Sequence, residues 1–393
     1  MKKILIIGAS ILQLPAIRKA KELGYYVAVA DYNPNAIGIS YADEYFNVST
    51  IDVDGVIEVA KTFRPDGVMT LATDMPMRAV AAACQVLGLP GITPDTALKA
   101  TDKGEMIKAF KKYGVEHPWF FVVKDKTELK NILREVTYPC IMKPTDNAGS
   151  RGVVLCHSID DITSEYEYSH HESRSGAVII EEYLQGPEFS VEVMVVDGAP
   201  YILQITDKLT TGAPHFVEMG HSQPTQQPEM IQKQIKDLAR RAVKAVGINI
   251  GPAHVEMILT KNGPKMVELG ARMGGDCITT HLVPLSTGID MVAATIKLAC
   301  GEEVDIEPKW SKGAAIRYFK TPAGVLKSIE GVKEVQNTLG VVEISFVHEV
   351  GELVGEIGSS VDRIGFVIAQ GETRNEAIEI CKKAKELISI KIG

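Results

Sequence analysis

The first hundred residues alternate short apolar runs with longer segments of helical spacing. The apolar runs are residues 4–7, 26–30 and 67–71, and the helical segments are residues 12–23, 54–62 and 75–87. Gly24 and Gly88 follow two of these segments, at the position where a glycine commonly ends a helix. Strands that are apolar throughout are typical of a parallel sheet covered on both faces. The pattern therefore predicts a doubly wound, Rossmann-like α/β domain over residues 1–100.

The rest of the chain mixes strands and helices in another order, which predicts an α+β fold after the α/β start. The expected units are a small lobe at residues 101–184, a larger lobe at 185–300 and a C-terminal part of the larger lobe at 301–393. Helical spacing marks residues 127–135, 229–246 and 289–300. We expect the small lobe to begin with a linker helix and to have one further helix among the short strands of residues 115–183. A last helix is expected to begin at the capping box formed by Thr373 and Glu376.

The composition is that of a globular protein and disfavours several classes of partner. Apolar residues make up 45% of the chain and charged residues 23%, close to the average for folded domains, which argues against disorder. The net charge of −8 provides no basic surface for nucleic acid. No apolar run reaches the ~18–20 residues that cross a bilayer. The six cysteines contain no C-x-x-C pair, so we expect a reduced, cytoplasmic protein.

Two glycine-containing turns are candidates for contact with a phosphate. Gly8 is the first glycine of a dinucleotide-binding fingerprint whose second glycine is missing, which disfavours a nicotinamide oxidoreductase. The loop at residues 146–152 contains Gly149, Ser150 and Gly152, and its backbone N–H groups are suited to wrapping an anion. It lacks the Gly-Lys-Ser/Thr of a P-loop, and an ordinary hairpin loop is the alternative.

Two lysines stand where a charge needs a partner. Lys143 lies in the apolar run 139–144, and Lys103 opens a helix after Asp102. Burying a charge without a partner destabilises a protein by about 3–5 kcal/mol. A nucleotide phosphate is one candidate partner for each lysine, and a nearby carboxylate is the other.

Alternation along residues 188–195 separates polar from apolar side chains. Glu188, Ser190 and Glu192 share one face of the strand, and Phe189 and Val191 lie on the other. The polar face is either part of a binding site or an exposed surface of the sheet.

The hairpin at residues 254–270 places two glutamates opposite each other. If residues 261–263 form a three-residue turn, Ile258 faces Met266 and Glu256 faces Glu268. Opposed like charges destabilise a strand pair unless something compensates them, and a divalent cation does so economically. The pattern favours a magnesium site, although a shift of one residue would separate the pair, and two exposed carboxylates are the alternative.

Arg272 follows on the same face as Glu268, before a turn rich in glycine. A guanidinium near a metal-held triphosphate is suited to stabilising a phosphoryl group in transfer. A surface salt bridge is the alternative for this arginine.

Taken in this order, the motifs resemble those of the ATP-grasp superfamily over nearly the whole chain. The resemblance implies a Rossmann-like domain before a two-lobed ATP-grasp fold, with ATP and Mg²⁺ (or Mn²⁺) as cofactors. By similarity, Lys103 and Lys143 contact ATP phosphates, residues 146–152 form the lid, Glu181, Glu182 and Leu184 hold adenine, Glu188 binds ribose, Glu256 and Glu268 bind the metal, and Arg272 steadies an acyl phosphate.

The chain also departs from the family's patterns. Gly270 stands where the usual Glu-x-Asn-x-Arg motif has an asparagine, so one oxygen ligand is missing and a second metal ion is less firmly held. Stretches at 280–290 and 364–377 resemble the biotin carboxylase and carbamoyl phosphate synthetase branch. The Met-Gly-Gly-Asp at 273–276 is closer to amino-acid ligases, which argues against bicarbonate as the substrate.

The chemistry that the resemblance implies is ATP-dependent ligation of a carboxylate to an amine, both small molecules, with an amino acid as a candidate substrate. The substrate candidates are His221 in an expected loop at residues 206–228, together with Gly274 and Asp276. A solvated loop residue is the alternative for the histidine. A purine-pathway ligase such as phosphoribosylglycinamide synthetase and a non-catalytic ATP-binding module are the alternative functions. A homodimer through the larger lobe would fit the family.

Overall fold

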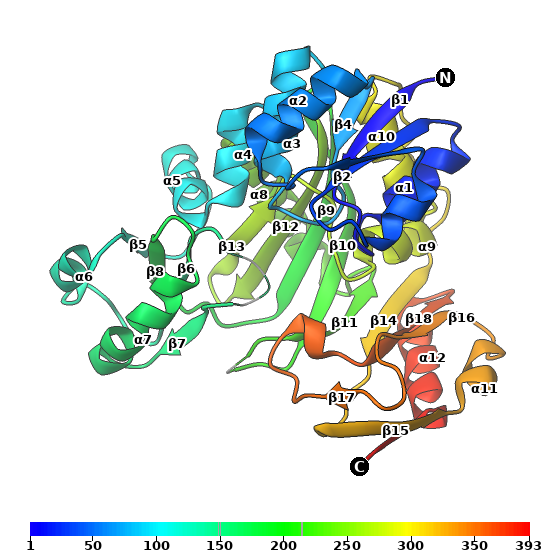
Figure 1. Cartoon of the computed structure of the whole chain (residues 1–393). Coiled ribbons are helices and arrows are strands. Elements are labelled where there is room, and N and C mark those ends of the chain that lie inside the picture. The colour runs from blue at the N-terminus through cyan, green and yellow to red at the C-terminus, as the bar shows by residue number, and fades with distance from the viewer. Residues whose placement is uncertain (148, 150, 214) are drawn as a thin grey trace.

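A computed structural model describes residues 1–147, 149, 151–213 and 215–393 (Figure 1). The N-terminal domain contains a parallel sheet of order β3-β2-β1-β4, which confirms the predicted α/β class. Its elements are β1 (Lys3–Ile7), α1 (Leu14–Glu22), β2 (Tyr26–Asp31), η1 (Ile37–Tyr41), β3 (Glu44–Asn47), α2 (Val53–Phe63), β4 (Gly67–Met69) and α3 (Met77–Leu87). No apolar run in the sequence marked β3, because each residue of this edge strand stays at least partly exposed.

Two helices, α4 (Pro94–Thr101) and α5 (Lys103–Tyr113), lead from this domain into the small lobe. The lobe is an antiparallel sheet of order β5-β8-β6-β7 with two helices. Its elements are β5 (Phe120–Val123), α6 (Lys126–Ile132), β6 (Cys140–Pro144), β7 (Val154–Cys156), α7 (Ile159–His171) and β8 (Val178–Glu182). The prediction of a single helix here is wrong. Helix α7 buries only Ile162, Tyr166 and Ser169, which is a weak helical pattern, although Ser158 and Asp161 form a capping box at its start.

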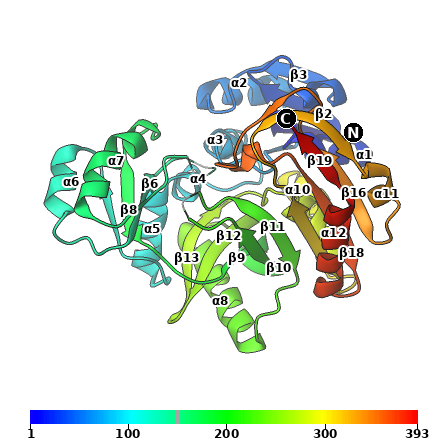
Figure 2. The ribbon, with the colours of Figure 1, turned by 90° about the horizontal axis from the view of Figure 1, so that it is seen from below.

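The larger sheet has eight strands in the order β13-β12-β9-β10-β11-β14-β18-β16. Its first part is built from β9 (Glu188–Val196), β10 (Ala199–Thr210), β11 (Glu218–Gln223), α8 (Glu229–Val246), β12 (Gly251–Thr260) and β13 (Gly263–Gly270), followed by η2 (Ile278–Leu282), α9 (Val283–Thr287) and α10 (Met291–Ala299). The C-terminal strands continue the same sheet, and the small lobe lies on the opposite side of the molecule from them (Figure 2).

The C-terminal residues add a second, three-stranded sheet of order β17-β15-β19. The remaining elements are β14 (Gly313–Tyr318), β15 (Gly324–Glu330), α11 (Val332–Gln336), β16 (Val341–Phe346), β17 (Leu353–Val354), η3 (Ser360–Asp362), β18 (Gly365–Gly371), α12 (Arg374–Leu387) and β19 (Ser389–Ile392). Thr373 caps α12 as expected, by accepting a hydrogen bond from the N–H of Glu376. The boundaries of the four expected units remain predictions.

Both faces of the larger sheet are covered, which places polar side chains of β9 inside the protein. Phe189 and Val191 pack in one core with Leu238 of α8. On the opposite face Ser190 and Glu192 are fully buried, so the alternative of an exposed polar face is wrong. The polar face of β9 therefore borders an internal site.

No single helix within the described ranges is long and apolar enough to cross a membrane. The helices at Ile278–Thr287 and Met291–Ala299 reach that length and composition only as a pair, and they are bent by 114° at the break between them.

Candidate active site

The β12–β13 hairpin has a different turn from the expected one. Thr260 pairs with Gly263, so the turn between the strands has two residues instead of three. Next to the turn, Ile258 faces Lys265, and the predicted pairing of Ile258 with Met266 is wrong. Continued along the strands, this register would place the two glutamates on opposite faces.

A β-bulge corrects the register before the glutamates are reached. The pairing shifts between Met257 and Glu256, and Val267 is the extra residue on β13. As a result Glu256 lies directly opposite Glu268, as predicted. The two carboxylates can therefore act together on one cation.

A cavity lies beside this pair, and the N-terminal domain contributes to its wall. Its polar lining includes Asp74, Lys103, His254, Glu256, Glu268 and Arg272. Lys103, in the first turn of α5, lies 3.0 Å from Glu268 and donates a hydrogen bond to the carbonyl of Asn147. Burial alone would raise the pKa of Glu268, but the positive charge of Lys103 holds this pKa below its ordinary value.

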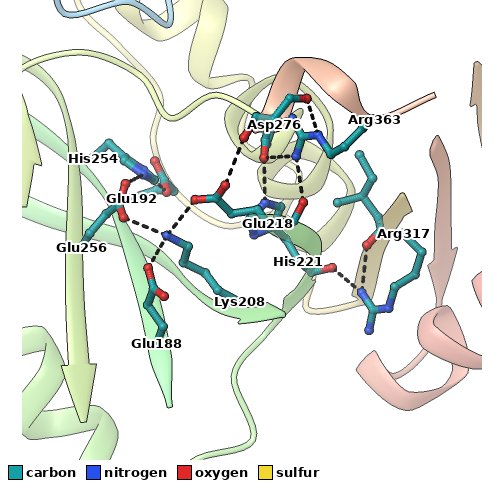
Figure 3. Close-up of polar contacts among 12 residues, drawn as sticks. Glu188, Glu192, Lys208, Glu218, His221, His254, Glu256, Asp276, Arg317 and Arg363 are labelled. Atoms are coloured by element: carbon teal, nitrogen blue, oxygen red, sulfur yellow. Dashed lines mark hydrogen bonds and ion pairs between the residues drawn. The ribbon is translucent and has the colours of Figure 1, made fainter. Parts of the chain in front are cut away.

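Lys208 on β10 is a buried cation that the sequence analysis did not select. Its side chain is 3% exposed, and its Nζ lies 2.7 Å from Glu256, 2.5 Å from Glu188 and 3.4 Å from Glu218 (Figure 3). Burial would lower the pKa of Lys208, but Glu256 and the other carboxylates raise it well above its ordinary value. Strand β10 also contains Gln204, Thr206 and Asp207, so no apolar run in the sequence marked Lys208 as a buried charge.

His254 links two buried carboxylates of the same sheet. Its Nδ1 lies 2.7 Å from Glu192, and its Nε2 lies 3.2 Å from Glu256. Burial would lower the pKa of His254, but Glu192 and Glu256 raise it to about 9. Because residues two apart share a face of a strand, the spacing from Glu256 was a signal for His254 that the sequence analysis did not use.

Arg272 is bound by a residue of the N-terminal domain. Its Nε and Nη2 each donate to a carboxylate oxygen of Asp74 at 2.9 Å. The arginine side chain is 12% exposed and lines the cavity, so the alternative of a surface salt bridge is wrong. Burial would lower the pKa of Arg272, but Asp74 raises it above its ordinary value. Sequence reasoning missed Asp74.

The residues expected to hold the nucleotide lie on the small lobe and at the join between the lobes. Lys143 on β6 forms a 2.5 Å ion pair with Glu181 on β8. Glu182 is paired with Lys265, and Leu184 is buried just after β8. Lys103 thus pairs with Glu268 and Lys143 with Glu181, so each lysine has a carboxylate partner. Contact of either lysine with a nucleotide phosphate remains a prediction.

The expected lid connects β6 and β7. Gly152 has a positive φ of 75°, and its carbonyl accepts a hydrogen bond from the buried hydroxyl of Ser169 on α7. Gly149 also has a positive φ, of 70°, but nothing lies within 4 Å of the position of a Cβ there. Ser150 lies outside the described residues.

Of the three substrate candidates, Gly274 borders His254, whereas His221 and Asp276 form a cluster with Arg363. His221 is 1% exposed on β11, so the alternative of a solvated loop residue is wrong, and its Nε2 lies 3.2 Å from Asp276. Asp276 also accepts two 2.7 Å hydrogen bonds from Arg363 (Figure 3). A Cβ at Gly274 would lie 2.6 Å from Nδ1 of His254, which requires glycine at this position.

Comparison with known proteins identifies a domain within the chain. The ATP-grasp domain profile matches residues 136–280, the segment that contains the glutamate pair and Arg272. The chain therefore contains an ATP-grasp domain. Its C-terminal residues 317–393 match the L-amino acid ligase C-terminal domain 2. ATP-grasp ligases join carboxylates to amines at the expense of ATP, with Mg²⁺, and this chain is such an enzyme.

Similar proteins are ligases of small molecules. The chain is 27% identical over 323 residues to an alanine–anticapsin ligase of Bacillus subtilis, covering 76% of this chain and 67% of that protein. It is 26% identical over 412 residues to a phosphoribosylamine–glycine ligase of Methanosarcina barkeri, covering 98% and 93%. The crystal structure of an L-amino acid ligase from Bacillus licheniformis superposes with a TM-score of 0.86 at 22% identity, covering 100% and 99%, which shows a shared fold.

The carboxylates of the site suit Mg²⁺ bound together with phosphate. Glu256 and Glu268 offer the oxygen ligands that Mg²⁺ prefers. Among the described residues no cluster of three or more His, Cys, Asp or Glu side chains could hold an ion alone. Mg²⁺ is commonly held by one or two carboxylates and the phosphates of a substrate.

Proposed function

We propose that this chain uses ATP to activate the carboxylate of an amino acid, releases ADP, and joins the acyl group to the amine of a second small molecule. The convergence of Lys103, Glu256, Glu268 and Arg272 on one cavity carries the proposal. This arrangement brings two cationic side chains beside a pair of carboxylates suited to Mg²⁺. It matches what a triphosphate and a substrate carboxylate need when they approach each other.

In the proposed reaction a carboxylate oxygen attacks the γ-phosphorus of ATP, the bond to ADP breaks, and an acyl phosphate forms. The amine nitrogen then attacks the acyl carbon, loses a proton, and expels phosphate. When bound, Mg²⁺ neutralises the phosphates. Lys103 adds positive charge beside Glu268, Arg272 stabilises the developing oxyanion, and the lid at 146–152 excludes water that would hydrolyse the acyl phosphate.

The match of residues 317–393 to a domain of L-amino acid ligases supports an amino acid as the carboxylate substrate. Asp276 and Arg363 join this C-terminal region to the ATP-grasp domain at the expected substrate site. A second candidate is the joining of glycine to phosphoribosylamine, favoured by the likeness to a phosphoribosylamine–glycine ligase over 98% of the chain.

ADP release by the purified protein with Mg-ATP tests the proposal, first with single amino acids, then with pairs, and with glycine plus phosphoribosylamine. Release that depends on one amino acid and on Mg²⁺ would support it and name the carboxylate. Release only with glycine and phosphoribosylamine would favour the second candidate. Mg-ATP binding without turnover on the whole panel would contradict both and favour a regulatory ATP-binding module.

We also propose a homodimer through the larger lobe, as in the family that the sequence resembles. Sedimentation velocity of the purified chain tests this, and a monomer at micromolar concentration would contradict it.

A further inference from the structure

Asp74 fills the space that a side chain at position 270 would occupy. A Cβ built on Gly270 would lie 2.6 Å from Oδ1 of Asp74 and 3.0 Å from Nε of Arg272. The φ of Gly270 is not in the left-handed region, so its backbone conformation is open to other residues. A side chain at position 270 would therefore have to displace the neighbouring carboxylate, whereas the backbone itself would accept one.

This carboxylate comes from a distant part of the chain. Asp74 lies in the turn between β4 and α3 of the N-terminal domain, 198 residues before Arg272. The carbonyl of Asp74 accepts a hydrogen bond from the N–H of Met77 at the start of α3, which fixes the turn. The asparagine that the ATP-grasp motif commonly has at position 270 is thus absent. The carboxylate of Asp74, from the N-terminal domain, occupies the space beside Gly270.

The contacts of Arg272 fix its guanidinium plane. Nε and Nη2 bond to Asp74, and Nη1 donates to the carbonyl of Met273 at 3.1 Å. Among the described residues these bonds occupy three of the five N–H groups of the guanidinium. A bidentate partner holds an arginine in one orientation, which a single contact does not do.

We propose that Asp74 is a positioning residue for Arg272: it orients the guanidinium so that its remaining N–H groups face the anion in the cavity. The inference rests on the proposed function, which supplies that anion. With this role for Asp74, the N-terminal domain contributes a residue that orients the active-site arginine. The same role explains why an active enzyme can have glycine at position 270.

A plain interdomain salt bridge is the competing explanation, and the chain offers a matched control for it. Lys19 on α1 lies 3.2 Å from Asp290 at the start of α10, so this pair also joins the N-terminal domain to the larger lobe. Unlike Asp74, neither residue lines the cavity. Lys19→Met therefore loosens the domain contact without touching the orientation of Arg272.

The first test compares kcat and KM for Asp74→Asn and Lys19→Met. Asp74→Asn keeps an acceptor for Nε but turns an amide N–H₂ toward Nη2, so we expect kcat to fall by at least about tenfold. We expect KM for ATP to change by less than about threefold, and Lys19→Met to keep wild-type kcat within about twofold. Wild-type kcat in Asp74→Asn, or equal losses in both variants, would overturn the proposal.

The second test is a double-mutant cycle between positions 74 and 270, read by thermal unfolding as well as by kcat. Gly270→Asn should lower Tm in the wild-type background because its Cβ meets Asp74, and should lower Tm by less than half as much in Asp74→Ala. The double variant should also regain part of the kcat lost in Asp74→Ala. Additive losses would overturn the proposal. If the wild type turns over no substrate, the proposed function fails, while the Tm cycle still tests the contact.

Discussion

At the scale of single residues, the charges around the cavity are kept ionised by one another. Lys103 lowers the pKa of Glu268, and Lys208 with His254 holds the pKa of Glu256 well below its ordinary value against the opposing effect of burial. Burial instead raises the pKa of Glu188, which shares Lys208 with Glu256. The pKa of Glu188 is therefore raised and that of Glu256 lowered, although both carboxylates contact Lys208. The more acidic of the two, Glu256, lies opposite Glu268.

We expect Glu268→Gln to abolish ATP turnover and to leave the fold intact, because the amide keeps the size of the side chain but not its charge. The loss should be at least about 10²-fold in kcat. Glu330→Gln, on the exposed strand β15, is the matched control and should keep wild-type turnover. Undiminished turnover in Glu268→Gln would remove the assignment of this residue to the metal.

The Asp276 cluster predicts a pH dependence of stability. Burial would raise the pKa of Asp276, but Arg363 and His221 hold it below its ordinary value. In the unfolded chain an aspartate has a pKa of about 3.9. Because the folded-state pKa is lower, ionised Asp276 stabilises the fold at pH values above about 3.9, and this stabilisation is lost as the pH falls further. Asp276→Asn should therefore be less stable than the wild type at pH 7, with a difference in urea-unfolding free energy that shrinks below about pH 4. A difference independent of pH would contradict this.

At the scale of elements, the predictable parts were those with a strong pattern. Helix α8 has the predicted bounds because a long apolar stripe packs against the sheet and Gly247 ends it. The β12–β13 hairpin shows the limit: the opposition of Glu256 and Glu268 was predicted, but it depends on a bulge at Val267 that compensates a shorter turn. No sequence pattern marked that bulge. Strand β12 keeps an unbroken register with β9, so the extra residue lies in the edge strand β13.

The base of the lid predicts a contrast between two glycines. Gly152→Ala places a Cβ 2.7 Å from Pro144 on β6 at a residue with positive φ, whereas Gly149→Ala has the positive φ without any contact. Both variants lose about 1 kcal/mol from the backbone conformation. We expect Gly152→Ala to lose a further ~1–3 kcal/mol of unfolding free energy and to raise KM for ATP. Equal effects of the two variants would contradict the packing of the lid base against β6.

At the scale of the whole molecule, the site is assembled from parts that no local pattern could bring together. Asp74 comes from the N-terminal domain and Arg363 from the C-terminal region, and each pairs with a residue of the turn that follows β13. Resemblance to a family identified the residues within the ATP-grasp motifs. It gave no indication of these two partners, because contacts between distant segments depend on how the domains pack.

Binding of Mg-ATP between the lobes should stabilise the whole chain. A ligand at 100 times its Kd adds about 2.7 kcal/mol, and we expect Tm to rise by several degrees in differential scanning calorimetry. ATP with EDTA should give a smaller shift, because Glu256 and Glu268 then repel the phosphates. An equal shift with and without Mg²⁺ would contradict the assignment of these carboxylates to the metal.

The transfer of ¹⁸O from the substrate carboxylate to phosphate tests the central claim most directly. The purified protein is supplied with Mg-ATP, its amine substrate and an amino acid whose carboxylate carries ¹⁸O, and the phosphate released is analysed by mass spectrometry. Attack of the carboxylate on the γ-phosphorus, followed by capture of the acyl phosphate, predicts one ¹⁸O atom in each phosphate formed with product. Product formation with unlabelled phosphate would contradict activation of the carboxylate as an acyl phosphate.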